Sequence, residues 1–114
     1  MWSKPDARVI DEELVFKISM TSDYKKIQSI SLASEKVTYL NYGNRVLTKL
    51  AHLIRLDLSF NRIEKIENLE PLKMLQELDL SGNPIAVIEN LNLSQLKSLV
   101  MDSCRLRKIE NLKV

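Results

Sequence analysis

Apolar residues recur along this chain at a fixed interval of 22 positions. The stretch LIRLDLSFNRIEKIENLEPLKM, residues 53–74, is followed by residues 75–95, which open LQELDLSGNPIAVIENL. The matching positions of the first copy are Leu53, Leu56, Leu58, Asn61, Ile63, Ile66, Asn68 and Leu69. They recur at Leu75, Leu78, Leu80, Asn83, Ile85, Ile88, Asn90 and Leu91. A third, incomplete copy covers residues 96–114 at an offset of 21, with Met101 for the third leucine and Cys104 for the asparagine.

Residues 27–52 fit the same pattern as a degenerate first repeat at an offset of 26. Its apolar positions are Ile27, Ile30, Leu32, Val37 and Leu40. Glu35 stands where the later copies have asparagine. The extra residues fall in NYGNR, residues 41–45, whose asparagine and glycine favour turns. Because the apolar register is kept on both sides, we expect an insertion confined to one loop.

The N-terminal residues change to a helical spacing. Residues 6–19 place apolar side chains at i, i+4 and i+8, namely Ile10, Leu14 and Ile18. Asp11 is the expected N-cap, with Asp6 as an alternative start one turn earlier. We expect this helix to cover the first repeat, since a terminal repeat has no neighbour on one side. The alternative is an amphipathic helix that binds a membrane or a partner's groove. Residues 1–26 are thus predicted to be an arm and a capping helix.

The L-x-L segment of each copy predicts a short strand with both leucines on one face. The amide that follows can donate to and accept from the backbone, so it is expected to turn the chain. Asn61 and Asn83 should therefore stack with Cys104 as a buried ladder. A second set of asparagines is expected to N-cap short helical turns; these are Asn68, Asn90 and Asn111.

The pattern L-x-x-L-x-L-x-x-N/C-x-L is the signature of leucine-rich repeats. The phrase LDLSFNRIEKIENL resembles the 22-residue class typified by the nuclear regulatory subunit of protein phosphatase 1, over residues 27–114. The helix at VIDEELVFKI, followed by a degenerate repeat, is similar to the start of centriolin and of axonemal adaptor proteins. The resemblance implies an α/β fold: a right-handed solenoid with short parallel strands on its concave face and an N-terminal helical cap.

The same resemblance implies a non-catalytic scaffold that binds proteins, since members of the class work at phosphatases, centrosomes, cilia and the spliceosome. The start of the chain is charged and no apolar run reaches 18 residues, so we expect an intracellular protein without a membrane span. The expected location is the cytoplasm, at a centrosome or cilium, with the nucleus as an alternative. The single Cys104 cannot form an internal disulfide, and we interpret it as a structural thiol.

The residues offer no arrangement suited to catalysis. His52 is the single histidine, so no second histidine completes a metal site or activates a nucleophile. Gly43 and Gly82 stand alone and form no phosphate-binding loop. We therefore predict that the protein is not an enzyme and needs no metal or cofactor.

The residues that alternate with the leucines should face away from the core and form the binding surface. Strands about 4.8 Å apart would gather an acidic cluster there, tempered by one arginine and with one aromatic residue at its rim. The predicted partner-binding residues are Arg55, Asp57, Phe60, Glu77, Asp79 and Asp102. Such a surface favours a protein partner with a basic or polar segment. The alternative is that LDLS is simply common at these positions in the class.

Two other functions and one exposed edge complete the predictions. The formal charge of +2 does not demand a nucleic acid, but a basic flank could serve a ribonucleoprotein; it comprises Arg62, Lys65, Arg105, Arg107 and Lys108. Regulation of a phosphatase follows from the resemblance.

Because residue 114 falls inside the last repeat, we expect the strand at residues 99–101 to be covered by the rest of a longer chain or by a second copy.

Overall fold

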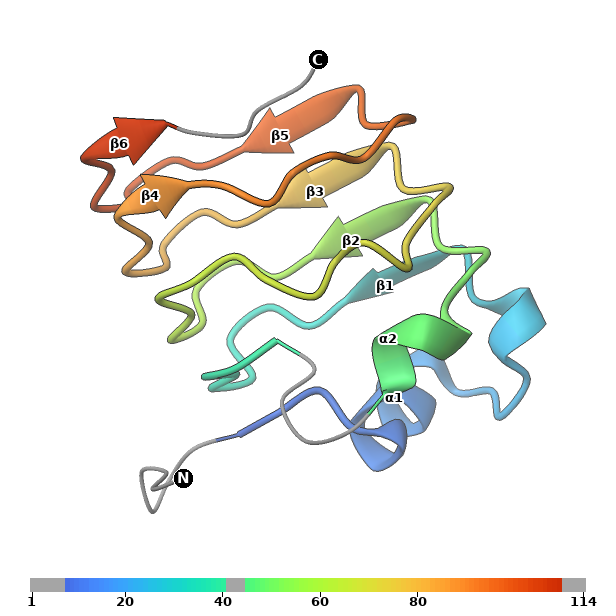
Figure 1. Cartoon of the computed structure of the whole chain (residues 1–114). Coiled ribbons are helices and arrows are strands. Elements are labelled where there is room, and N and C mark those ends of the chain that lie inside the picture. The colour runs from blue at the N-terminus through green and yellow to red at the C-terminus, as the bar shows by residue number, and fades with distance from the viewer. Residues whose placement is uncertain (1–7, 41–44, 110–114) are drawn as a thin grey trace.

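A computed structural model describes residues 8–40 and 45–109 of the chain (Figure 1). Its helical elements are α1 (Glu12–Ser19), the 3-10 turn η1 (Tyr24–Lys26) and α2 (Val46–Lys49). Its strands are β1 (Ser29–Ser31), β2 (Arg55–Asp57), β3 (Glu77–Asp79), β4 (Val87–Ile88), β5 (Ser98–Val100) and β6 (Lys108–Ile109). Short strands with few helices are what the repeat pattern predicts.

Four strands form one parallel sheet in the order β1-β2-β3-β5. Their registers place Ile30 beside Leu56, Leu56 beside Leu78, and Leu78 beside Leu99. The sequence offsets of 26, 22 and 21 are therefore the offsets of the paired strands, which confirms the predicted alignment. In Figure 1 these strands lie side by side, while β4 and β6 form a second parallel pair away from them.

The repeated apolar residues form one continuous core. We call the structure formed by one repeat a coil. Leucine or isoleucine at the repeat positions is almost fully buried in the first three coils, as Leu32, Leu58 and Leu80 show at 0% exposure. The degenerate repeat keeps this burial, because Ile27 and Val37 are as deeply placed as their later equivalents. Of the predicted insertion at residues 41–45, positions 41–44 lie outside the described residues.

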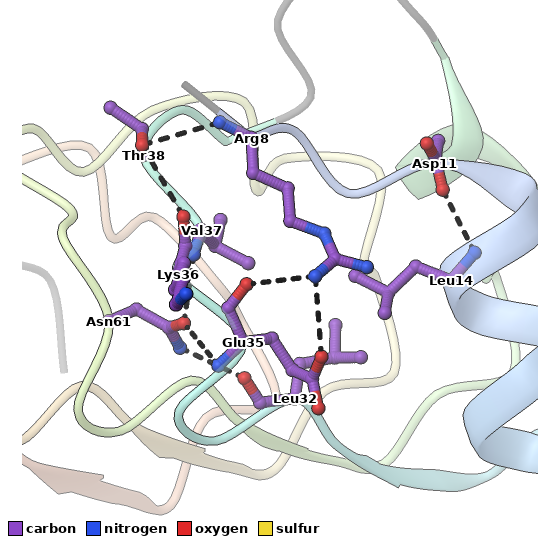
Figure 2. Close-up of polar contacts among 9 residues, drawn as sticks. All are labelled: Arg8, Asp11, Leu14, Leu32, Glu35, Lys36, Val37, Thr38 and Asn61. Carbon is purple, nitrogen blue, oxygen red and sulfur yellow. Dashed lines mark hydrogen bonds and ion pairs between the residues drawn. The ribbon is translucent and has the colours of Figure 1, made fainter. Parts of the chain in front are cut away.

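The helix α1 begins as predicted at an aspartate. Oδ1 of Asp11 accepts a hydrogen bond from the backbone N–H of Leu14 at 2.9 Å (Figure 2). Asp11 itself is extended, with φ −114° and ψ 173°, so the helix does not run back toward the alternative start at Asp6, which lies outside the described residues. Leu14 and Val15 are buried, and the helix contacts β1. The acidic residues of its first turn and Lys17 lie on its polar faces.

Asparagine side chains join successive coils, as the predicted ladder requires. Figure 2 shows Oδ1 of Asn61 accepting from the backbone N–H groups of Glu35 and Val37, each at 3.0 Å. Its Nδ2 donates to the carbonyl of Leu32 at 2.9 Å. One coil later, Asn83 donates to Leu58 at 2.9 Å. The ladder is confirmed in these two coils, and each amide crosses from its own coil to the preceding one.

The two non-asparagine positions of the ladder behave differently. Sγ of Cys104 donates to the carbonyl of Leu80 at 3.3 Å, so the cysteine makes one of the bonds that asparagine makes elsewhere. The carboxylate of Glu35 has no N–H with which to donate. It forms an ion pair with Arg8 at 3.6 Å, and Nη1 of Arg8 also donates to the Glu35 carbonyl at 3.3 Å (Figure 2). The segment before α1 therefore contacts the first coil at its ladder position, through bonds that differ from those of the asparagines.

The prediction that Asn68 and Asn90 are N-caps is wrong. Both have left-handed backbones, with φ of 61° and 58°, and no helix follows them in the described range. Their Nδ2 groups donate to the carbonyls of Leu40 at 3.1 Å and Ile66 at 2.8 Å. These carbonyls hold equivalent positions in successive coils, so the two asparagines form a second ladder between coils. Asn111, the third residue of the set, lies outside the described residues.

Candidate functional site

The outward face of the four-stranded sheet carries a groove of about 380 Å³. Every strand contributes to it, because alternate residues of each strand point away from the core. The side chains that line it outside the core positions are Ser29, Ser31, Arg55, Asp57, Glu77, Asp79, Ser98 and Val100. We call this the strand-face groove. Its charged residues all lie on β2 and β3, with serines and one valine on the two outer strands.

The one basic residue of the groove is engaged by one of its acids. Nε of Arg55 donates to Oε2 of Glu77, its neighbour in the strand register. Both side chains are largely exposed, at 63% and 49%, so this is a surface ion pair that adds little to stability. The pairing leaves the negative charge of the groove on Asp57 and Asp79.

Asp57 is held by three hydrogen bonds. Its Oδ1 accepts from the N–H of Ser59 at 2.9 Å and from the Ser59 hydroxyl at 2.6 Å, and Oδ2 accepts from the Ser31 hydroxyl at 3.2 Å. Burial raises the pKa of this carboxyl, but the three bonds outweigh burial, so its pKa lies below the usual value. Asp57 is therefore both a charge in the groove and a support for the turn after β2.

Acid should destabilise the protein through Asp57. Because the pKa of the folded state is below the unfolded value of about 3.9, the carboxylate stabilises fully above that pH and loses its contribution as the pH falls through the folded pKa. Urea denaturation at a series of pH values from about 5 downward should show a shallower loss of stability in Asp57→Asn than in the wild type. Ser31→Ala, which removes one bond, should fall between. Equal slopes in all three proteins would contradict this role.

Asp79 is the more available acceptor. The register places it directly beside Asp57. Its Oδ1 accepts from the N–H of Ser81 at 2.9 Å, whereas no described residue donates to its Oδ2. An incoming cationic group can therefore bond to Asp79 without breaking a bond that the fold uses.

The structure brings together four of the six predicted site residues, and separates two. Arg55, Asp57, Glu77 and Asp79 line the strand-face groove. Phe60 and Asp102 do not; both follow the strand ends and are exposed. Ser29, Ser31, Ser98 and Val100 were not predicted as site residues, although the alternation that places Asp57 on this face places them there too.

Phe60 lies in a column of residues with left-handed backbones. The same position of each coil has positive φ, and the column comprises Ser34 at 57°, Phe60 at 56°, Gly82 at 71° and Ser103 at 58°. The ring of Phe60 lies against Gly82, since a Cβ at that glycine would be 2.5 Å from Cδ1 of the ring. Phe60 is 64% exposed and so presents an aromatic surface beside the turns.

The predicted basic flank is only partly assembled. Arg62 and Arg105 border a separate hollow of about 280 Å³ over the turns, together with Gly82, Pro84 and Ser103. Arg107 and Lys65 are exposed but do not border this hollow. The side chain of Lys108 lies outside the described residues.

Two features that the described part of the chain lacks bear on other functions. Residues 8–40 and 45–109 contain no group of three or more His, Cys, Asp or Glu placed to hold a metal ion. Within the same ranges, no helix has the length and apolar character needed to cross a membrane. The single histidine, His52, is exposed.

Comparisons with known proteins agree with the geometry. A family model described as leucine rich repeat matches residues 25–85, and a second, described as leucine rich repeats in two copies, matches residues 73–114. No curated protein matches the chain. Domains of this kind generally bind other proteins and are typically not catalytic. The match over residues 25–85 covers more than half of the chain, which therefore belongs to the leucine-rich repeat family.

Proposed function

We propose that this protein is a non-catalytic interaction module whose strand-face groove binds an extended, basic or polar segment of another protein. One observation carries the proposal: three carboxylates and a single guanidinium gather in an open groove on the free face of a parallel sheet. Complementary charge of this kind speeds encounter and selects the partner. Leucine-rich repeats generally bind proteins, which supports this use of the groove.

The groove's residues suit a short extended segment that crosses the strands. Four strands spaced at about 4.8 Å span roughly 14 Å, the length of about four extended residues. A lysine or arginine over β3 would donate to the open oxygen of Asp79. The hydroxyls of Ser29 and Ser98 can pair with backbone groups at the two ends, and Val100 offers a small apolar contact.

The wider setting follows from the repeat pattern. We propose that the coils form a short right-handed solenoid and that α1 caps its first coil, since Leu14 and Val15 are buried beside β1. The resemblance to centriolin and axonemal adaptors supports a scaffold role in a cytoplasmic, cytoskeletal assembly. Resemblance to the same repeat class supports an alternative to this scaffold role, namely regulation of a protein phosphatase. RNA binding at Arg62 and Arg105 is the alternative that the hollow beside them favours.

A matched set of charge variants tests the groove. Glu77→Gln with Asp79→Asn removes two charges, and each amide retains an oxygen in place of the carboxylate oxygen that accepts in the wild type. Asp102→Asn makes the same kind of change outside the groove. Affinity purification from cells, followed by mass spectrometry, should recover a partner with the wild type and with Asp102→Asn. The groove variant should lose it, with affinity reduced on the order of tenfold or more.

The recovered material separates the alternatives. Equal recovery with the groove variant would place the binding site elsewhere on the molecule. A phosphatase catalytic subunit among the lost proteins would identify the regulatory role. Recovery that disappears after nuclease treatment, and that falls steeply as salt is raised, would instead indicate the ribonucleoprotein role.

A further inference from the structure

The turns that follow the strands carry a second open site, apart from the strand-face groove. It is the hollow of about 280 Å³ that Arg62 and Arg105 border, and we call it the turn hollow. The other residues that line it are neutral; they are Asn61, Gly82, Asn83, Pro84 and Ser103. Among the described residues that line it, two therefore carry a positive charge and none carries a negative charge.

The turn hollow exists because the third coil is small where its neighbours are large. The third coil has Gly82 and Pro84 at the positions where the second coil has Phe60 and Arg62, and the fourth coil has Arg105 at the second of these positions. Stacked coils repeat at the strand spacing of about 4.8 Å, so the backbones of the two arginines lie roughly 10 Å apart. Their long side chains can both reach one group that sits between them.

The stack fixes the backbone of both arginines in the same way. The N–H of Arg62 donates to the carbonyl of Val37 at 2.8 Å, and the N–H of Arg105 donates to the carbonyl of Ile85 at 3.0 Å. Val37 and Ile85 hold the same repeat position, so the two bonds are equivalent. Pro84, between the arginines, has no N–H to donate. The backbone of the turn hollow is therefore ordered, while both arginine side chains are exposed to solvent.

The chemistry of the turn hollow favours a phosphate monoester. A guanidinium presents its N–H donors in a planar fork that matches the oxygens of a phosphate or carboxylate. Two guanidiniums balance a phosphate monoester, with its charge of about −1.5 to −2 at pH 7, better than a carboxylate. The volume is slightly below the roughly 300 to 1,000 Å³ of pockets that enclose a drug-sized molecule. The turn hollow therefore suits one charged group carried on a larger molecule.

The surroundings of the turn hollow do not suit a nucleic acid. Binding to a nucleic acid draws its strength from many phosphate contacts along a basic stripe. Lys65 and Arg107 are exposed but lie outside the turn hollow, and the exposed Glu64 adds a negative charge to the same flank. The two arginines around one hollow thus offer a place for a single phosphate group.

An exposed apolar side chain stands next to the turn hollow. The ring of Phe60 is 64% exposed and lies against Gly82, which lines the hollow. Residues beside a phosphorylated one in a protein can pack on this ring. Leucine-rich repeats generally bind proteins, which also favours a protein as the carrier of the phosphate. We propose that the turn hollow binds a phosphorylated serine, threonine or tyrosine side chain of a partner protein, independently of the strand-face groove.

Titration with phosphopeptides tests this site directly. The probes are three alanine-rich peptides of one sequence, with a central phosphoserine, phosphothreonine or phosphotyrosine, together with their unphosphorylated forms. Nuclear magnetic resonance of the isotope-labelled protein gives both the affinity and the location of binding. At least one phosphopeptide should bind and should shift the side-chain N–H signals of Arg62 and Arg105. The unphosphorylated peptides should leave these signals unchanged.

Matched charge variants show whether the turn hollow holds the phosphate. Arg62→Gln with Arg105→Gln should weaken binding on the order of tenfold or more, because both guanidiniums donate to the phosphate. Lys65→Gln with Arg107→Gln is the control, since it removes the same charge from the same flank outside the hollow. At physiological salt it should change the affinity by less than about threefold. Arg62→Lys with Arg105→Lys keeps the charge but should still weaken binding several-fold, because lysine lacks the planar fork.

Three results would overturn the proposal. One is a wild type that binds none of the phosphopeptides at near-millimolar concentration. Another is an equal loss of affinity in the two glutamine variants, which would mean that the charge of the whole flank attracts the phosphate. The third is a single-stranded RNA of about ten nucleotides that binds more tightly than every phosphopeptide and whose affinity falls steeply with salt, which would identify a nucleic-acid surface instead.

Discussion

Replacing Asn83 with alanine is expected to lower the free energy of unfolding by about 3 kcal/mol, which is a large share of the stability of a small domain. The side chain is 1% exposed and joins three backbone segments. Its Nδ2 donates to the carbonyls of Leu58 and Leu80, both at 2.9 Å, and its Oδ1 accepts from the N–H of Ile63 at 3.1 Å. Alanine leaves these buried groups without the partner that asparagine supplies, and water cannot easily replace it.

The chain itself provides a graded comparison for this position. Cys104 fills the same place one coil later and donates to the Leu80 carbonyl, so Asn83→Cys should cost less than Asn83→Ala. Asn83→Asp should cost more than alanine at neutral pH, because a buried carboxylate would face the two carbonyls that the amide now satisfies. Lower pH should restore part of that loss by protonating the new aspartate, which can then donate.

Urea denaturation followed by circular dichroism measures the series. Asn92→Ala is the control, because Asn92 is exposed and its replacement should change stability by less than about 0.5 kcal/mol. The predicted order of stability is wild type, cysteine, alanine and then aspartate. The contradicting result is a free energy of unfolding for Asn83→Ala that lies as close to the wild-type value as that of Asn92→Ala. That result would show that the ladder does not stabilise the stacked coils.

The strand registers and the core could be predicted from the sequence because one physical rule governs both. A strand that slips by one residue turns its leucines to solvent, so buried leucines at matching positions determine which residues pair. Leu56, Leu78 and Leu99 align at the offsets counted along the chain. Hydrogen bonds between residues close in sequence could be predicted equally well. Asp11 is an example, because its carboxylate caps the helix by accepting from the N–H of Leu14, three residues later.

Contacts between coils were harder to predict. Asn68 and Asn90 stand where an N-cap would, but their side chains donate to carbonyls 28 and 24 residues earlier. Such a bond depends on the spacing of stacked coils, which a local pattern does not contain. The site shows the same limit. The alternation of inward and outward side chains along a strand places Asp57 and Asp79 in the strand-face groove. This alternation stops where the strand stops, and in the left-handed turn that follows, Phe60 lies outside the groove.

Replacing Gly82 with alanine is expected to cost about 2 kcal/mol, in two separable parts. The backbone has φ of 71°, a conformation that costs an L-residue roughly 1 kcal/mol. The new Cβ would also lie 2.5 Å from Cδ1 and 2.8 Å from Cε1 of Phe60, so the ring must leave its place. Since the ring is 64% exposed, it can rotate toward solvent, which limits the second part to the contact it loses.

A double-mutant cycle separates the two parts. In a Phe60→Ala background the clash is gone, so Gly82→Ala should cost only the backbone part, and the two substitutions should show a coupling of about 1 kcal/mol. Ser103→Ala is the matched control, because Ser103 already has a side chain at the equivalent left-handed position, with φ of 58°, and the change should be close to neutral. Additive costs at Gly82 and Phe60 would mean that the ring does not rest on the glycine. A measurable coupling would show that the Phe60 ring packs against Gly82 at the turns, beside the groove and outside it.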